Sequence, residues 1–259
     1  MTGWRIAGAL ALGLTGLGLT GLGLTGLAPW LGAWAAEAPG CAGPGDMVLH
    51  DMALPHARAA VAAGRALSIL AVGGSTTAGT AAGGGEHSYT ARLAARLAAT
   101  LPGVNVRIAT SAMAHRSARV MADQLDADIA ASRPDIVIWG VGGLEAGRHQ
   151  LIERFAGTLA RGIDKAGAAG ADVILMDVLY APSIARVVDL TTYRDATATT
   201  AQAHGAMVLD RHDLMRRWSE AGVVDLDATD PGVRIGVARK LFDCFAAILA
   251  DGITAAVRR

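Results

Sequence analysis

The chain has 259 residues, with 23 Lys and Arg balanced by 23 Asp and Glu, so its formal net charge is zero. This balance gives no electrostatic reason to expect nucleic acid or another polyanion as a partner. Aromatic residues make up only 4% of the chain, which argues against an aromatic binding platform and suits small-residue helices packed on a sheet. The length accommodates one α/β domain preceded by a targeting segment.

The N-terminal segment is apolar and separate from the rest. No charge occurs from Ile6 to Ala36, Arg5 supplies one positive charge before it, and Leu12–Gly26 repeats Leu-Gly-Leu-Thr-Gly three times. Small residues in Ala33-Trp34-Ala35 suit a signal peptidase, so we predict a signal peptide at residues 1–35 and a secreted or periplasmic protein. The alternative is an uncleaved anchor in the inner membrane that faces the periplasm. The membrane would be reached only through this segment.

Two cysteines occur, Cys41 near the predicted mature start and Cys244 near the end. In an oxidising compartment, such a pair predicts a disulfide that ties the N-terminal arm to the last helix. Two unpaired small apolar side chains are the alternative. A lipidated Cys41 is disfavoured because proline precedes the glycine in Ala38-Pro39-Gly40-Cys41. No metal-ligand spacing is found, and we expect neither a metal nor a cofactor.

Short β-type runs alternate with longer helical patterns after a linker and N-terminal arm at residues 36–66. The expected strands are 68–72, 104–109, 135–141, 172–177 and 206–209. The expected helices are 89–100, 116–131, 153–169, 183–204 and 232–256. Five βα units predict an α/β domain at residues 67–259, with three α/β/α layers and a five-stranded parallel sheet. The run 135–141 is almost entirely apolar, as in a strand buried on both faces, and its Trp139 is expected in the core.

A serine follows the first expected strand directly. Leu67–Val72 leads into Gly73-Gly74-Ser75, and glycine tolerates the sharp turn that lifts a hydroxyl clear of a sheet. In such folds the chemistry gathers at the carboxyl ends of the strands. The residues expected at the same edge are Ser75, His115, 142–145, 180–182 and 225–230.

Several segments in the right order resemble the SGNH, or GDSL-type, ester hydrolases, in particular a bacterial secreted branch. Gly73–Gly79 resembles the serine block of that family. The other matching segments are Ser88–Leu93, Leu101–Val104, Arg133–Gly142, Leu175–Pro182 and Asp210–Trp218. The resemblance covers about residues 41–253 and implies a flavodoxin-like SGNH hydrolase fold with a nucleophilic serine.

The resemblance also implies functional positions, and most of them are altered here. Ser75 is at the nucleophile position, and its N–H is an oxyanion donor. The second-block glycine, another oxyanion donor, falls at Ala114. The third-block asparagine falls at Leu144, which cannot donate a hydrogen bond. The family's aspartate and histidine fall at Val224 and Asp227.

Two of these losses do not depend on the alignment. Asn105, in an expected strand, is the only asparagine, and no histidine follows His212. One oxyanion donor is worth about 10²–10³ in rate, and the base of a serine triad about 10⁶. An exposed aspartate such as Asp227 is a weak proton acceptor at pH 7. We therefore expect a hydrolase scaffold with degenerate catalytic blocks.

Other residues near the expected edge have competing interpretations. His115, and after it His87, is a candidate replacement base, and the alternative is a solvated loop histidine. Ser75 is either a nucleophile or a relic that hydrogen-bonds within its own turn. Glu145 follows the asparagine position, where a charge also suits a helix N-terminus. The acidic residues at 225–230 are expected to cap the last helix rather than bind metal.

Three functions fit this sequence. The first is a weakly active or inactive ester hydrolase-like envelope protein that binds an acylated carbohydrate or a partner protein. The second is an active serine esterase or deacetylase on O-acyl carbohydrates or small esters, with a non-standard base such as His115. The third is a purely structural role for an anchored protein. An imidazole within hydrogen-bond reach of the Ser75 hydroxyl would favour the second.

Overall fold

A computed structural model describes residues 40–41 and 53–259. The predicted signal peptide or anchor at 1–35, and most of the linker that follows it, lie outside the described residues. Contacts group residues 37–259 into one compact unit. Of the helices in the described ranges, none combines the length and hydropathy needed to cross a lipid bilayer.

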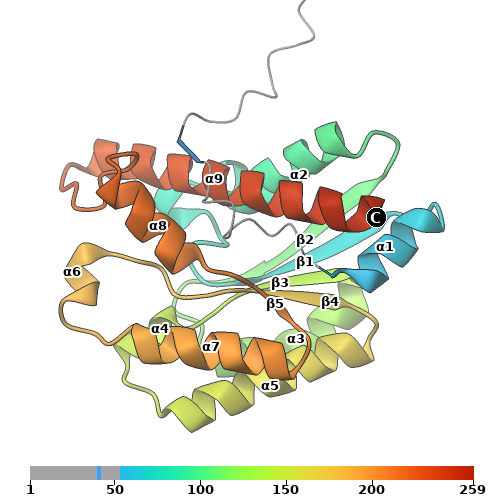
Figure 1. Ribbon diagram of the computed structural model, residues 1–259, viewed down its shortest axis with the longest axis horizontal. Coiled ribbons are helices and arrows are strands. Elements are labelled where there is room, and N and C mark those ends of the chain that lie inside the picture. Colours follow the sequence, from blue (N-terminus) through green and yellow to red (C-terminus); the bar gives the residue numbers. More distant parts are fainter. Residues whose placement is uncertain (1–39, 42–52) are drawn as a thin grey trace, which may run out of the picture. The chain divides into compact units, whose positions relative to one another are not determined.

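A five-stranded parallel sheet forms the centre of this unit (Figure 1). Its spatial order is β2-β1-β3-β4-β5. The strands are β1 (Leu67–Gly73), β2 (Val106–Ala112), β3 (Ile136–Gly140), β4 (Asp172–Met176) and β5 (Met207–Leu209). The chain runs from β1 outward to β2 and then returns past β1 to β3, so the topological switch lies between β1 and β3. Ligands of such sheets bind at the carboxyl ends beside the switch point.

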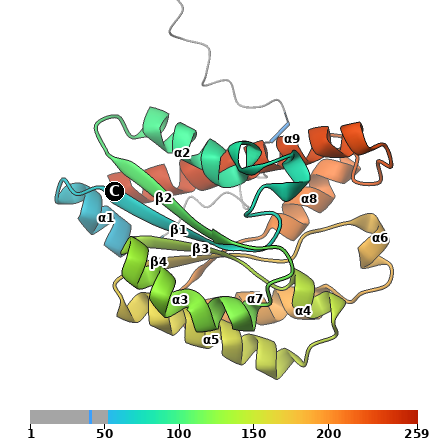
Figure 2. The same ribbon diagram turned by 180° about the vertical axis from the view of Figure 1, so that it is seen from behind.

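Helices cover both faces of the sheet, which confirms the predicted three-layer α/β/α class (Figures 1 and 2). On one face lie α1 (Pro55–Ala62), α2 (Tyr89–Thr100), α8 (Arg211–Glu220) and α9 (Pro231–Arg258). On the other lie α3 (Ala118–Ser132), α4 (Gly143–Gly147), α5 (Ile152–Ala168) and α7 (Thr191–Ala203). Successive strand residues point to opposite faces: Ile138 packs with the first group and Trp139 with the second.

One long expected helix is divided in the structure. The segment predicted as a single helix at 183–204 forms α6 (Pro182–Ala185) and, after a break, α7. Asp189 causes the restart, because its carboxylate accepts the N–H groups of Thr191 at 3.0 Å and Thr192 at 3.4 Å. An aspartate before a helix competes for the first free amides and so favours a new N-terminus.

Besides the short α4, two helices of the described chain were not expected from the sequence. Helix α8 begins after Asp210, whose carboxylate accepts the Asp213 N–H at 2.9 Å. Helix α1 lies within residues 36–66, which the sequence predicts as linker and arm. Its first turn is held by the Asp172 carboxylate, which accepts the Ala57 N–H at 2.9 Å. In both cases one carboxylate fixes the start of the helix, and the spacing of apolar residues gives no information about such a hydrogen bond.

A disulfide joins Cys41 to Cys244 in α9, as the sequence predicts. Their Cα atoms are 5.1 Å apart, and 203 positions separate them in the chain. The loop closed by this bond spans nearly the whole domain. Such a bond restricts the unfolded chain and typically contributes about 2–5 kcal/mol to a small secreted domain.

Trp139 of β3 packs against a glycine of α5. The indole is 1% exposed, and a Cβ placed on Gly162 would lie only 2.3 Å from one of its ring carbons. Gly157, in the same helix, has different surroundings. The nearest atom to a Cβ there is the end of the flexible Arg161 side chain, at 3.7 Å. Glycine is therefore required at 162 and merely tolerated at 157.

We predict that Gly162→Ala lowers the free energy of unfolding, although alanine is the better helix former. Overpacking against a fixed ring costs about 1–3 kcal/mol, which exceeds the gain of about 1 kcal/mol in helix propensity. The matched Gly157→Ala variant should instead gain about 0.5–1 kcal/mol. Urea denaturation of both variants measures these changes. If the free energy of unfolding changed in the same direction in both variants, the prediction would be contradicted.

Candidate active site

Ser75 lies on an exposed turn just beyond the carboxyl end of β1. The N–H groups of Ala78 and Thr80 close the turn by donating to the carbonyls of Gly74 at 3.0 Å and Ser75 at 3.1 Å. A Cβ on Gly73 would lie 2.1 Å from the Thr77 hydroxyl oxygen, so the turn folds back tightly over glycine. The Ser75 hydroxyl itself forms no hydrogen bond with the described residues. The alternative of a serine bonded within its own turn is therefore not seen.

The loop after β2 lies beside this turn. The Met113 N–H donates to the Gly73 carbonyl at 3.2 Å and joins the two segments. Ala114 and His115 follow on an exposed turn, and His115 has a φ of 62°, in the left-handed region that non-glycine residues rarely occupy. The backbone N–H groups of Ser75 and Ala114 donate to no acceptor in the described part of the chain. Two amides are thus free to face a carbonyl oxygen.

No histidine in the described ranges hydrogen-bonds to Ser75. The His115 side chain forms no hydrogen bond or ion pair there. The His87 ring lies 3.8 Å from the Glu86 carboxylate, and both groups are partly exposed. The structure therefore leaves the serine hydroxyl without a bonded base.

Glu145 links the loops after β2 and β3. It is 2% exposed, and its carboxylate accepts the N–H of Ala118, the first residue of α3, at 2.6 Å. The charge thus stabilises the N-terminus of the neighbouring helix α3 rather than that of its own helix α4. Leu144, beside it in α4, is half-buried and presents an aliphatic group at the expected asparagine position.

The segment before α9 carries the expected aspartate and histidine positions. Val224 is 5% exposed and belongs to the core. Asp227 is exposed, and its N–H donates to the Asp225 carboxylate at 3.0 Å. Asp230 caps α9, as predicted, by accepting the Val233 N–H at 2.9 Å. This segment is therefore organised by turns and caps, with an apolar side chain at the expected aspartate position.

A buried polar cluster, which the sequence patterns did not predict, lies under the same edge. Arg211, 5% exposed, donates through Nε to the Asp177 carbonyl. Its guanidinium lies 3.6 Å from where a Cβ of Gly140 would be, at the end of β3. Burial lowers the pKa of Arg211, and burial raises the pKa of Tyr89 to about 12. A cation is thus held beneath the carboxyl ends of β3 and β4.

Asp177, His212 and Arg194, whose Nε lies 3.5 Å from an Asp177 carboxylate oxygen, complete this cluster. Burial first, and repulsion from Asp210 second, raise the pKa of Asp177 to about 8, against the opposing influence of Arg211. The His212 N–H donates to the Asp177 carboxylate at 3.2 Å. The ring of His212 meets Tyr180 edge-on at 5.2 Å, and its Nδ1 has no hydrogen-bond partner within the described residues. The sequence offered one sign of this cluster: charged residues directly follow two strands, Asp177 after 172–176 and Asp210-Arg211 after 207–209.

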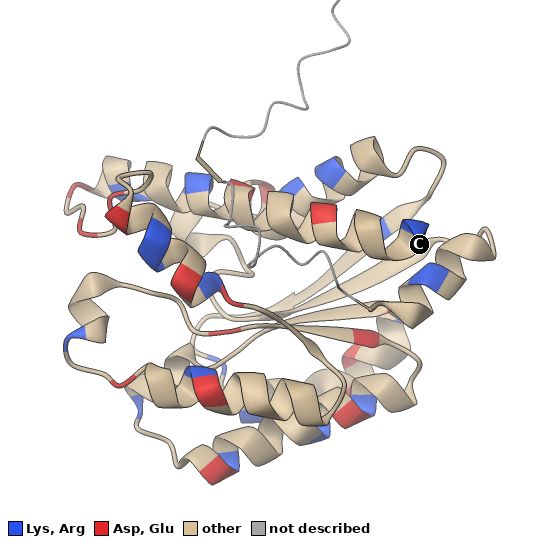
Figure 3. Ribbon diagram, in the orientation of Figure 1, with Lys and Arg blue, Asp and Glu red and all other residues tan. Residues whose placement is uncertain are grey.

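The exposed large apolar side chains gather at this same edge of the sheet. They lie in the connections that follow the strands or in the first turns of the next helices. The set comprises Met113, Val120, Leu151, Leu179, Ile184, Val187, Val233 and Ile235. Figure 3 shows acidic and basic residues both on the helices and in the loops at this edge. The edge that carries Ser75 therefore mixes exposed apolar side chains with charges of both signs.

Comparison with protein families shows to which family the chain belongs. A model described as the non-GDSL lipase-like family matches residues 40–259. The chain belongs to the non-GDSL lipase-like family. The assignment confirms the predicted relation to lipolytic SGNH-type hydrolases, and its name agrees with the absence of a Gly-Asp-Ser-Leu serine block here. Comparison with curated proteins gives no match.

Solved structures similar to this family member confirm the flavodoxin-like SGNH hydrolase fold. TesA is 20% identical with a TM-score of 0.56, and the match covers 70% of this chain and 97% of TesA. A lipase/acylhydrolase from Enterococcus faecalis is 17% identical, with a TM-score of 0.56 and coverages of 73% and 96%. A variant of Axe2, an acetylxylan esterase from Geobacillus stearothermophilus, is 16% identical, with a TM-score of 0.57 and coverages of 71% and 93%.

We predict that Asp177 makes the folded protein less stable as the pH rises. In the unfolded chain this carboxyl loses its proton near pH 4, whereas in the folded protein it holds the proton until about pH 8. Between these values the unfolded state binds fewer protons, so the free energy of unfolding falls by up to about 1.4 kcal/mol per pH unit. Asp177→Asn keeps an acceptor for the His212 N–H but cannot titrate.

Urea denaturation between pH 4 and 8 measures this effect. The stability of the natural protein relative to Asp177→Asn should decline across that range and level off above it. A constant difference between the two proteins would show that Asp177 is ionised throughout.

Proposed function

We propose that this chain is an ester hydrolase-like protein of the cell envelope that binds an acylated carbohydrate or small ester with weak or no turnover. The observation that carries the proposal is the exposed Ser75 hydroxyl without a hydrogen-bonded imidazole in the described structure. A serine hydroxyl is a poor nucleophile at neutral pH unless a base accepts its proton. The altered positions Leu144, Val224 and Asp227 point the same way.

Binding of an ester group remains compatible with the site. The free amides of Ser75 and Ala114 suit a carbonyl oxygen, since paired backbone N–H groups are the usual oxyanion donors. The apolar side chains around the edge, such as Met113 and Val187, suit the acyl part of an ester. Without a proton acceptor, this arrangement would hold the ester more readily than cleave it.

The acylated carbohydrate and the envelope location have separate support. One structural neighbour, Axe2, is an acetylxylan esterase, which favours an O-acyl sugar as the ligand class. The Cys41–Cys244 disulfide suits an oxidising compartment. We therefore place the protein outside the cytoplasm, either secreted or periplasmic, or held at the inner membrane by residues 1–35.

One observation favours an active serine esterase or deacetylase as the second candidate. His115 follows the oxyanion position Ala114 and adopts the left-handed φ of 62°. Strained backbone conformations concentrate at functional sites. A ligand-induced shift of this turn would bring the imidazole to Ser75, since catalytic hydrogen bonds often tighten only when substrate is bound.

A hydrolysis assay distinguishes the two candidates. We predict that the full chain hydrolyses p-nitrophenyl acetate and acetylated xylo-oligosaccharides far more slowly than an ordinary enzyme, whose kcat is about 1–10³ s⁻¹, and that Ser75→Ala and His115→Gln lower this rate little or not at all. A kcat within that range that is lost in Ser75→Ala would overturn the proposal of weak or lost activity. Loss in His115→Gln as well, with a changed pH profile, would establish the second candidate.

We also predict that Leu144→Asn with Asp227→His introduces Ser75-dependent hydrolysis. One oxyanion donor alone is worth about 10²–10³ in kcat, so a gain of at least about tenfold should be measurable. Val224 is left unchanged because an aspartate there would bury an unpaired charge in the core. The same double variant with Ser75→Ala is the control. No gain would show that these replacements do not limit the reaction.

A further inference from the structure

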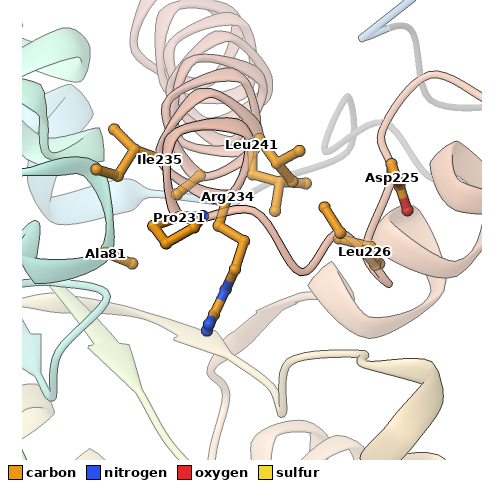
Figure 4. Close-up of a pocket in the computed structure, with 10 residues that line it drawn as sticks. Ala81, Asp225, Leu226, Pro231, Arg234, Ile235 and Leu241 are labelled. Carbon is orange, nitrogen blue, oxygen red and sulfur yellow. The ribbon is translucent and has the colours of Figure 1, made fainter.

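A pocket of about 350 Å³ lies between Ala81, in the segment that follows the serine turn, and the start of α9 (Figure 4). One wall is the short 3₁₀ helix Thr80–Ala82, and the other is the beginning of α9 with the segment before it. Arg239 of α9 donates through Nε to the Ala82 carbonyl at 2.9 Å. This bond ties the two walls together, so the pocket is formed before any ligand arrives.

The walls of this pocket are aliphatic. The apolar residues that form them include Ala81, Leu226, Ile235, Val237, Ala238 and Leu241. No aromatic ring and no hydroxyl or amide side chain is among the lining residues. Sugars and nucleotides are recognised through stacking and several side-chain hydrogen bonds, which these walls do not offer. The lining instead suits a flexible aliphatic chain.

Two charged residues border the pocket, Asp225 and Arg234, and only the guanidinium lacks a hydrogen-bond partner among the described residues. The Asp225 carboxylate accepts the Asp227 N–H at 3.0 Å. The Arg234 guanidinium forms no hydrogen bond or ion pair with any described residue. Figure 4 shows the Arg234 side chain extended away from Asp225. An aliphatic cavity with one unpaired cation at its border matches a ligand with an apolar chain and one anionic end.

We propose that this pocket binds an aliphatic monocarboxylate of medium chain length. The chain packs against the aliphatic walls, and the carboxylate pairs with Arg234. This binding requires no bond cleavage at Ser75, so it goes beyond the proposed function and does not depend on it. The volume of about 350 Å³ lies at the lower end of the range for ligand pockets, which suits a medium chain better than a long one.

Calorimetric titration of the full chain with hexanoate, octanoate and decanoate tests the proposal. The affinity should rise about fourfold for each added methylene until the pocket is filled. Methyl octanoate, which lacks the charge, should bind more weakly than octanoate. Affinities that do not depend on chain length would overturn the proposal.

Variants then locate the site. Arg234→Gln should weaken octanoate binding about fivefold, the upper end for an exposed ion pair. Arg186→Gln is the matched control, since Arg186 is exposed and unpaired among described residues but lies outside the pocket. In Ala81→Leu the larger side chain narrows the pocket, and because Ala81 is exposed the fold should not change. This variant should prefer a carboxylate with a shorter chain. Equal affinities in all three variants would place the binding elsewhere and overturn the proposal.

Because the titration measures binding and no ester is cleaved, its outcome is independent of the hydrolysis assay. An inactive protein that binds octanoate supports this inference. An active esterase whose octanoate affinity is unaffected by Arg234→Gln overturns it while establishing the enzyme.

Discussion

Parallel strands that are buried on both faces have room for exposed polar chemistry only where they end. Here β3 and β4 are almost wholly apolar between helices on either side, with Trp139 and Ile138 on opposite faces. The polar groups that can meet at these two strands therefore belong to the loops at their ends. Because the strands are parallel, the loops after their carboxyl ends all meet at one edge. The candidate site, the buried polar cluster and the aliphatic pocket all depend on this constraint.

The residues around the serine turn differ in how they are held. The turn of Ser75 is tight because Thr77 packs where a Cβ of Gly73 would be. Glu145 is fixed by the hydrogen bond that it accepts from the start of α3, and Val224 is fixed by its place in the core. Asp227, in contrast, is exposed on the segment before α9. Packing therefore determines the shape of this edge, whereas the exposed residues upon it are less constrained.

The cluster around Asp177 shows how burial shapes the same edge from beneath. Arg211 and Asp177 carry opposite formal charges within the same buried region, yet burial raises the pKa of Asp177 to about 8. Desolvation, with repulsion from Asp210, therefore outweighs the two nearby guanidinium groups of Arg211 and Arg194 for this carboxyl. The result is a net cationic group under the ends of β3 and β4, close to Thr77 beside Gly140. It lies beneath this edge and is not part of the exposed surface.

The sequence alone determined the sheet, because runs of consecutive apolar residues such as 135–141 form strands wherever both faces are covered. It also predicted the serine turn from Gly73-Gly74-Ser75, the disulfide between Cys41 and Cys244, and the Asp230 cap, since each rests on local chemistry or compartment. Only the tertiary structure decided which distant polar groups meet. The capping of α3 by Glu145, the Asp177 cluster and the Arg234 pocket depend on contacts between segments far apart in the chain. Periodicity records which face of an element is apolar, but it carries no information about the partner that a buried charge finds across the fold.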